Sequence, residues 1–181
     1  WFQLSLKEGL TVFRDQEFSA DMNSRAVQRI DDVNHLRRSQ FPEDASPLAH
    51  PIRPDNYIQI NNFYTMTVYE KGAEVIRMQH TLLGPKKYRE ATDLYFDRFD
   101  GMAVTCEDFV QCMTDASGLD KDLFFRWYQN AGTPTVNATS HYDAEKRQFS
   151  LNLSQSLPDT PGQTDKPPLL IPVAVGLIND N

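Results

Sequence analysis

The sequence changes its hydrophobic period at Gly132-Thr133-Pro134, and this change limits the folds that the chain can adopt. Before it, apolar residues recur at intervals of three and four, which is typical of amphipathic helices. After it, apolar and polar residues alternate over residues 147–154 (RQFSLNLS), which is typical of a half-buried antiparallel strand. We therefore expect a mainly α-helical part over residues 1–132 and a small antiparallel sheet over residues 133–181.

Start and stop signals divide the first part into successive helices. By residue range, the expected helices are 4–16, 24–38 (with Asn23 or Ser24 as the first cap), 67–83, 85–100, 105–117 and 120–131. Gly84 and Pro85 separate the third from the fourth, because glycine ends a helix and proline suits the first turn of the next. A second strand is expected over residues 169–177.

Three local patterns give sharper expectations. Val27, Ile30 and Val33 form an apolar stripe, so the second helix is expected to pack on the first. Residues 67–70 (TVYE) match a capping box, in which the Thr hydroxyl and the Glu carboxylate satisfy backbone donors of the first turn. Residues 42–54 contain four prolines in thirteen positions, which excludes a regular helix or a central strand and indicates an ordered or functional loop.

Composition excludes two classes of partner. Eighteen Lys and Arg residues against 25 Asp and Glu give a net charge of −7, so nucleic acid is not an expected partner, since duplex binding depends on clustered positive charge. No apolar run approaches the roughly 18 residues of a membrane helix, so a membrane is not expected either. Cys106 and Cys112 lie six positions apart in one expected helix, where a mutual disulfide is improbable. We expect two buried, reduced thiols of a cytoplasmic protein, with a zinc or redox pair as the lesser alternative.

The residues alone do not define a metal or catalytic site. The sequence has no H-E-x-x-H, C-x-x-C or G-x-S-x-G motif, and its four histidines are at least 15 positions apart, which favours structural roles for them. Glu8 and Asp15 are seven positions apart on one helix face, about 10 Å from each other, so they cannot chelate one ion together. Periodicity alone favours a solvated acidic stripe.

Several segments nevertheless resemble the zinc aminopeptidase N family, and specifically its bacterial cytosolic alanyl aminopeptidase branch. The segments are residues 7–18 (KEGLTVFRDQEF), 61–73 (NNFYTMTVYEKGA), 43–47 (EDASP), 49–54 (AHPIRP) and 126–128 (RWY). The resemblance covers essentially the whole chain. It implies the C-terminal part of a thermolysin-like α-helical catalytic domain over residues 1–132, followed over residues 133–181 by the first strands of a small β-sandwich.

The resemblance also implies a metal ligand. In the family, H-E-x-x-H is followed after eighteen residues by a Glu, and Glu8 matches this third ligand of one Zn²⁺ ion. Only seven residues precede Glu8, so the two histidines and the catalytic Glu are expected upstream of this sequence. We therefore expect an internal fragment of a cytoplasmic enzyme that removes N-terminal residues from peptides, inactive by itself because its zinc-binding helix is missing.

Three further residues receive roles from the same resemblance. Tyr69 matches the tyrosine whose phenol donates a hydrogen bond to the oxyanion of the tetrahedral intermediate; without the flanking match, a core tyrosine with a wet hydroxyl would be preferred. Tyr64 matches a residue that lines the pocket for the first substrate side chain, although core packing explains it equally well. Asp15 would orient a zinc-binding histidine, and a solvated or salt-bridged Asp15 is nearly as plausible.

A second hypothesis from another class stays open, namely a stand-alone, non-catalytic helical interaction module. Such a module needs no upstream helix and closes its surface with polar residues. A fragment should instead expose apolar faces, for example that of Leu6, Leu10 and Phe13.

Overall fold

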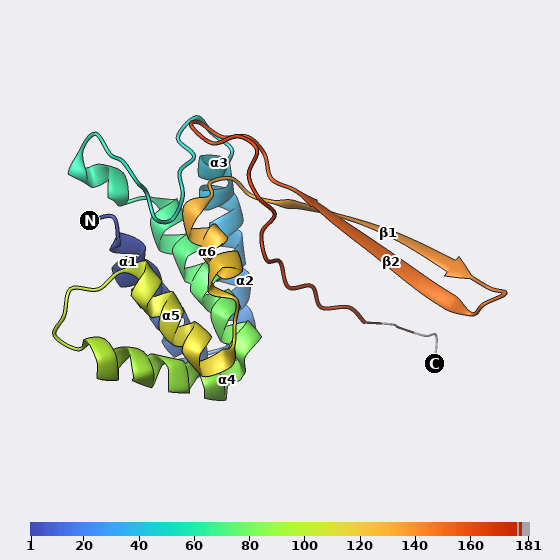
Figure 1. Cartoon of the computed structure of the whole chain (residues 1–181), viewed down its shortest axis with the longest axis horizontal. Coiled ribbons are helices and arrows are strands. Elements are labelled where there is room, and N and C mark those ends of the chain that lie inside the picture. The colour runs from blue at the N-terminus through green and yellow to red at the C-terminus, as the bar shows by residue number, and fades with distance from the viewer. Residues whose placement is uncertain (177, 179–181) are drawn as a thin grey trace.

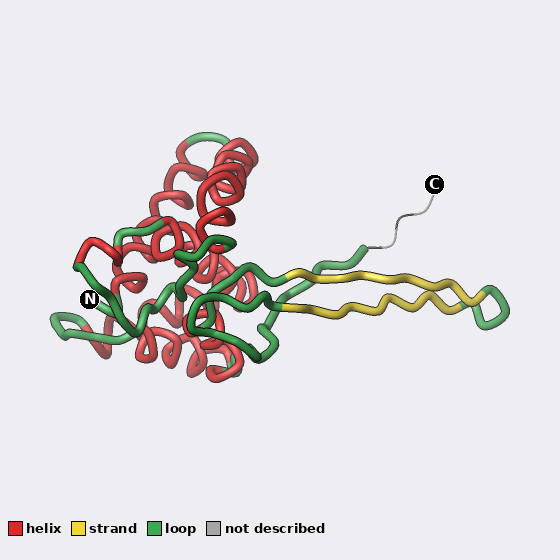
Figure 2. The backbone as a smooth tube through the Cα atoms, turned by 90° about the horizontal axis from the view of Figure 1, so that it is seen from above, coloured by secondary structure: helices red, strands yellow, loops and turns green. Residues whose placement is uncertain are grey.

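The computed structural model describes residues 1–176 and 178, and it shows a helical body from which a two-stranded hairpin extends (Figures 1 and 2). The helical elements are α1 (Leu4–Met22), α2 (Arg25–His35), η1 (Leu36–Gln40), α3 (Phe41–Asp44), η2 (Ile60–Phe63), η3 (Thr67–Lys71), α4 (Gly72–Phe99), α5 (Cys106–Ser117) and α6 (Lys121–Gln129). The strands are β1 (Thr135–Asp143) and β2 (Gln148–Ser156). The predicted fold class, mainly α with antiparallel strands at the end, is confirmed.

Several helix boundaries follow from the local sequence as predicted. The Thr105 hydroxyl accepts the Asp108 N–H at 3.2 Å, while the Asp108 carboxylate accepts the Thr105 N–H at 2.9 Å, so α5 begins with a complete capping box. Asp120 caps α6 by accepting the Leu123 N–H at 2.9 Å. Short-range hydrogen bonds of this kind depend only on neighbouring residues, which explains why sequence signals find them.

The long helix α4 is two helices joined at Gly84. This residue has φ of 74°, in the region that glycine reaches at no steric cost, and Pro85 begins the second half. The predicted break at Gly84-Pro85 is therefore confirmed. None of the helices in the described part of the chain is at once long enough and apolar enough to cross a bilayer.

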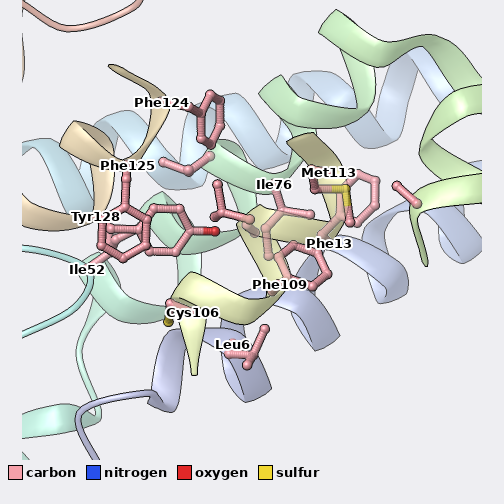
Figure 3. Close-up of a cluster of buried hydrophobic side chains, with 14 of the residues drawn as sticks. Leu6, Phe13, Ile52, Ile76, Cys106, Phe109, Met113, Phe124, Phe125 and Tyr128 are labelled. Carbon is pink, nitrogen blue, oxygen red and sulfur yellow. The ribbon is translucent and has the colours of Figure 1, made fainter. Parts of the chain in front are cut away.

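The core lies where α1, α4, α5 and α6 meet (Figure 3). Its labelled members are Leu6, Phe13, Ile52, Ile76, Cys106, Phe109, Met113, Phe124, Phe125 and Tyr128. Leu6 and Phe13 are only 8% and 4% exposed, and Leu10 packs against the same cluster. The expectation of an open Leu6, Leu10 and Phe13 face is wrong, because α4 and α5 of the same chain cover it. Cys106 and Cys112 are both free and buried.

The predicted packing of α2 on α1 is confirmed, but the predicted apolar stripe contributes little to it. Val27 and Ile30 are 57% and 60% exposed, and only Val33 of the stripe is partly buried. The helix is held instead by charged side chains: the two terminal nitrogens of Arg29 donate to the two carboxylate oxygens of Glu74 on α4 at 2.6 and 2.7 Å. A bidentate pair of this kind fixes the orientation of the two side chains as well as their distance. The amphipathic pattern of α2 does not show that this charged face, rather than the apolar one, is turned toward α4.

The proline-rich segment is more regular at its start than predicted. α2 continues through the wide turn η1 into α3, which spans Phe41–Asp44 and carries Pro42 in its first turn. Proline fits there because the first N–H groups of a helix need no intrahelical partner. The exclusion of helix from residues 42–54 was therefore wrong for Pro42 to Asp44.

The hairpin pairs β1 with β2 in antiparallel register, from Thr135 opposite Ser156 to Asp143 opposite Gln148. The predicted strand of residues 147–154 is confirmed as β2, whereas its partner β1 was not predicted. The prediction that one face of this strand is buried is wrong for this chain, because Phe149, Leu151 and Leu153 are 47%, 36% and 44% exposed. Their alternation marks one apolar face of the hairpin, uncovered in this structure.

The second predicted strand does not form over residues 169–176, and Leu177 lies outside the described residues. Hydrogen bonds from side chains hold this segment in place of the backbone hydrogen bonds of a sheet. The Gln155 amide donates to the Leu169 carbonyl and accepts the Leu169 N–H, both at 2.8 Å. The Trp127 indole donates to the Leu170 carbonyl at 2.7 Å.

Candidate active site

Glu8 lies in the second turn of α1, on the side of the helix that faces η3 and the start of α4. Its side chain is 16% exposed, and one carboxylate oxygen lies 3.1 Å from the Lys7 ammonium. The hydrogen bond to Glu8 and the negative charge of that carboxylate raise the pKa of Lys7. A carboxylate that is partly buried yet reachable from solvent can bind a cation, because it is incompletely hydrated.

Tyr69 lies in η3, the wide helical turn that leads into α4. Its ring packs against the small cluster of Leu4, Phe63 and Val68. Burial raises the pKa of the Tyr69 phenol, and the negative charge of Glu8 raises it further, which places the phenol within electrostatic reach of that carboxylate. The fold therefore brings together Glu8 and Tyr69, which are 61 positions apart in the sequence. A phenol with a raised pKa stays protonated and can donate a hydrogen bond.

Tyr64 lies beside Tyr69 at the edge of the same region. The two ring centroids are 6.4 Å apart, and Tyr64 is also 6.3 Å from Trp1. Half of the Tyr64 residue surface is exposed, so it is not a core residue and its ring is available to a ligand. Aromatic surfaces of this kind often line apolar side-chain pockets.

Asp15 is not brought into the group formed by Glu8, Tyr69 and Tyr64. It is exposed on α1, two turns beyond Glu8, and none of the hydrogen bonds or ion pairs among residues 1–176 involves its carboxylate. The region around Tyr69 contains Glu70 instead, whose carboxylate lies 3.6 Å from the His35 ring and accepts a 3.5 Å hydrogen bond from the Gln16 amide. Burial raises the pKa of Glu70.

The predicted capping box of Thr67 and Glu70 is wrong. The Thr67 N–H and the Thr67 hydroxyl both donate to one carboxylate oxygen of Glu43, at 2.8 and 2.6 Å. Glu43 belongs to α3 and therefore caps η3 from a distant part of the sequence. Sequence reasoning missed it because capping rules look only three residues ahead, whereas 24 positions separate these partners.

The donor chemistry of this region suits one ligand of a zinc ion rather than a complete site. A glutamate oxygen is an ordinary zinc ligand, and Glu8 provides one. In the described part of the chain, no group of three or more His, Cys, Asp and Glu side chains could hold a metal ion. The remaining ligands of any zinc bound at Glu8 would have to come from other residues.

Comparison with known proteins agrees with the arrangement of helices and strands. The model of the peptidase family M1 domain matches residues 1–128, and that of a domain of unknown function with an Ig-like fold matches residues 132–181. The chain is 60% identical to aminopeptidase N of Escherichia coli over 180 residues, and 56% identical to aminopeptidase N of Haemophilus influenzae over 181 residues. These alignments cover 99% and 100% of the chain but 21% of each relative, so the chain spans about a fifth of their length.

A solved structure gives the same result. Aminopeptidase A of Legionella pneumophila, crystallised with aspartic acid, superimposes with a TM-score of 0.75 and 30% sequence identity, over 86% of this chain and 17% of that one. The resemblance to bacterial aminopeptidase N that the motifs indicated is confirmed by the family model and by these relatives. The chain belongs to peptidase family M1.

Proposed function

We propose that this chain is part of a zinc aminopeptidase that hydrolyses N-terminal residues from peptides, and that Glu8 and Tyr69 belong to its active site. The observation that carries the proposal is the juxtaposition of these two residues. α1 packs against η3 and the start of α4, where the backbone of Gly9, next to Glu8, touches that of Gly72, three positions after Tyr69. A metal ligand and an oxyanion donor must both lie within reach of one substrate carbonyl. Membership of family M1 supports the assignment.

In this proposal Glu8 would hold the zinc through its carboxylate, together with two histidines outside this chain. Zinc, when bound, would polarise the substrate carbonyl and lower the pKa of a bound water. Tyr69 would donate its phenolic hydrogen to the oxygen that becomes negatively charged during attack. A tyrosine phenol keeps its proton throughout the neutral pH range, so Tyr69 can act as this hydrogen-bond donor.

Tyr64 and Asp15 receive supporting roles. The half-exposed ring of Tyr64, beside Tyr69, would line the pocket for the first substrate side chain. Asp15 would accept a hydrogen bond from a zinc-binding histidine, and its free, exposed carboxylate is compatible with this role. We also propose the division of the chain at residue 132, a preference for small or basic N-terminal residues, and a cytoplasmic location, which two free thiols support.

The first test is to read the coding DNA upstream of Trp1. The proposal requires an H-E-x-x-H motif whose second histidine lies nineteen positions before Glu8. In the complete enzyme, Tyr69→Phe should lower kcat roughly 10²-fold with zinc content unchanged, as expected for the loss of one oxyanion donor. Tyr142→Phe, at an exposed hairpin position, is the matched control. Unchanged turnover in Tyr69→Phe would remove Tyr69 from the mechanism.

The 181-residue chain by itself provides a complementary test. After dialysis it should retain negligible zinc and cleave no peptide, because a single carboxylate gives little affinity without the other ligands. Stoichiometric zinc in the isolated chain, or turnover that a chelator abolishes, would contradict the proposal that Glu8 is the one zinc ligand that this chain supplies.

A non-catalytic interaction module is the second candidate, and one observation favours it. Leu6 and Phe13 are buried within the chain, so the helical body covers this stripe without an upstream helix. The exposed face of Phe149, Leu151 and Leu153 favours the first proposal, since an apolar sheet face needs a covering layer.

A further inference from the structure

The turn that carries Tyr69 is fixed by side chains from outside its own helix. Met66 precedes η3 and forms no side-chain cap, so the first N–H groups of the turn need other acceptors. Glu43 supplies one carboxylate oxygen to both the Thr67 N–H and the Thr67 hydroxyl, at 2.8 and 2.6 Å. Thr67 is fully buried, so water cannot replace Glu43 without rearrangement.

A second anchor acts on the adjacent N–H group. The Thr65 hydroxyl accepts the Val68 N–H at 3.2 Å and is itself 2.8 Å from His50 Nε2. His50 Nδ1 lies 2.7 Å from the Leu48 carbonyl, which can only accept, so this nitrogen carries the proton and Nε2 is free to accept the Thr65 hydroxyl. Val68 therefore stays capped when Glu43 is removed, and η3 should loosen rather than unfold.

The position of Tyr69 follows from these contacts. Its own N–H donates to the Thr65 carbonyl at 3.1 Å, one position beyond the two capped residues. A shift of Thr67 therefore moves the backbone from which the phenol projects toward Glu8. Groups that act on a transition state lose much of their effect when displaced by about 1 Å.

We propose that Glu43 is a positioning residue of the active site, which holds the Tyr69 phenol in place by capping Thr67. This inference rests on the proposed role of Tyr69. It assigns a physical role to the segment EDASP (residues 43–47), which belongs to the resemblance but has no part in the chemistry proposed above.

The kinetic test is a double-mutant cycle in the complete enzyme. Glu43→Ala should lower kcat roughly 10-fold or more with little change in KM and zinc content. Glu43→Gln keeps an acceptor oxygen in the same place and should recover most of that loss. In a Tyr69→Phe background, Glu43→Ala should have almost no further effect on kcat, because it acts through the phenol. Glu90→Ala, at an exposed position of α4, is the control.

A structural test on the 181-residue chain separates the failure of this inference from the failure of the proposed function. Amide hydrogen exchange, followed by NMR, should show faster exchange at Thr67 in Glu43→Ala but not in Glu43→Gln, with Cys106 and the rest of α5 unchanged. Unchanged exchange at Thr67, or full and additive kinetic losses in the Tyr69→Phe background, would overturn the positioning role of Glu43. Normal turnover in Tyr69→Phe alone would instead overturn the proposed function.

Discussion

Gly9 on α1 and Gly72 at the start of α4 touch through their backbones. A Cβ atom added to Gly9 would lie 2.9 Å from the carbonyl carbon and 3.1 Å from the Cα of Gly72, whereas a Cβ added to Gly72 would lie 3.3 Å from the Gly9 Cα. Gly9 follows Glu8 directly, and Gly72 is three positions after Tyr69. The absence of two side chains therefore lets the helix of the proposed ligand approach the turn of the proposed oxyanion donor.

This contact predicts unequal effects for two similar substitutions. Gly9→Ala should destabilise the chain by about 1–3 kcal/mol, because the new methyl group meets backbone that cannot rotate away. Gly72→Ala should be close to neutral, since its milder contact is offset by the better helix propensity of alanine, about 0.5–1 kcal/mol. Urea unfolding followed by circular dichroism measures both. Equal stability of Gly9→Ala and the wild type would show that α1 and α4 are not in close contact.

A buried ion pair gives the second prediction. Lys71 and Asp44 are 2.8 Å apart with side chains 8% and 0% exposed, and Asp44 also accepts the Gly132 N–H at 2.8 Å. Lys71→Met leaves this carboxylate buried without its counter-charge, so we expect a loss of about 3–5 kcal/mol in the free energy of unfolding. Lys146→Met, which removes an exposed pair with Asp143, should cost less than about 1 kcal/mol. Similar losses in the two variants would contradict the burial of the Lys71 pair.

The same carboxylate predicts a pH dependence. Burial alone would raise the pKa of Asp44, but the Lys71 charge and the hydrogen bonds from Lys71, Gly132 and Thr133 lower it below its usual 3.8. Protons then bind the unfolded state more readily, so the contribution of Asp44 to stability is complete above about pH 4 and is lost as the pH falls through the lowered, folded-state pKa. Free energies of unfolding measured from pH 6 down to pH 2 should therefore fall less steeply in Asp44→Asn than in the wild type. Parallel curves would refute this contribution.

These features differ in how far the sequence could predict them. The start of α5 after Thr105 and the break at Gly84 depend on adjacent residues, so local patterns found both. The cap of Thr67 by Glu43 was predicted wrongly as a cap by Glu70, because no periodicity links positions 24 apart. The orientation of α2 could not be predicted either, because an apolar stripe on a helix does not show whether residues of the same chain cover it.

The candidate site shows the same limit. Spacing alone favoured a solvated Glu8 and a core Tyr69, and only the family resemblance singled them out as a pair. Their adjacency depends on the Gly9 and Gly72 contact, in which the informative feature is a missing side chain. A glycine usually destabilises a helix. That it allows two helix backbones to approach closely becomes evident only when the facing helix is known.

The apolar face of the hairpin supplies the last prediction. The hairpin stands apart from the helical body (Figure 2). Leu151 and Leu153 alternate with polar residues and so share one face of it, and they are 36% and 44% exposed. The 181-residue chain should therefore bind a hydrophobic dye and self-associate at high concentration. Threonine at both positions keeps a high β-propensity while removing apolar surface, so Leu151→Thr/Leu153→Thr should lower dye fluorescence and shift sedimentation toward monomer.

The matched control places threonine on the opposite, polar face. Ser150→Thr/Asn152→Thr changes two neighbouring positions of β2 to the same residue without removing apolar surface, so dye binding and sedimentation should stay as in the wild type. Equal dye binding by both double variants would mean that another exposed apolar region, such as Val27 and Ile30 on α2, dominates association. A face that attracts its own copies in this way is one that, in a longer chain, a second sheet would cover, because an Ig-like fold packs two sheets through their apolar faces.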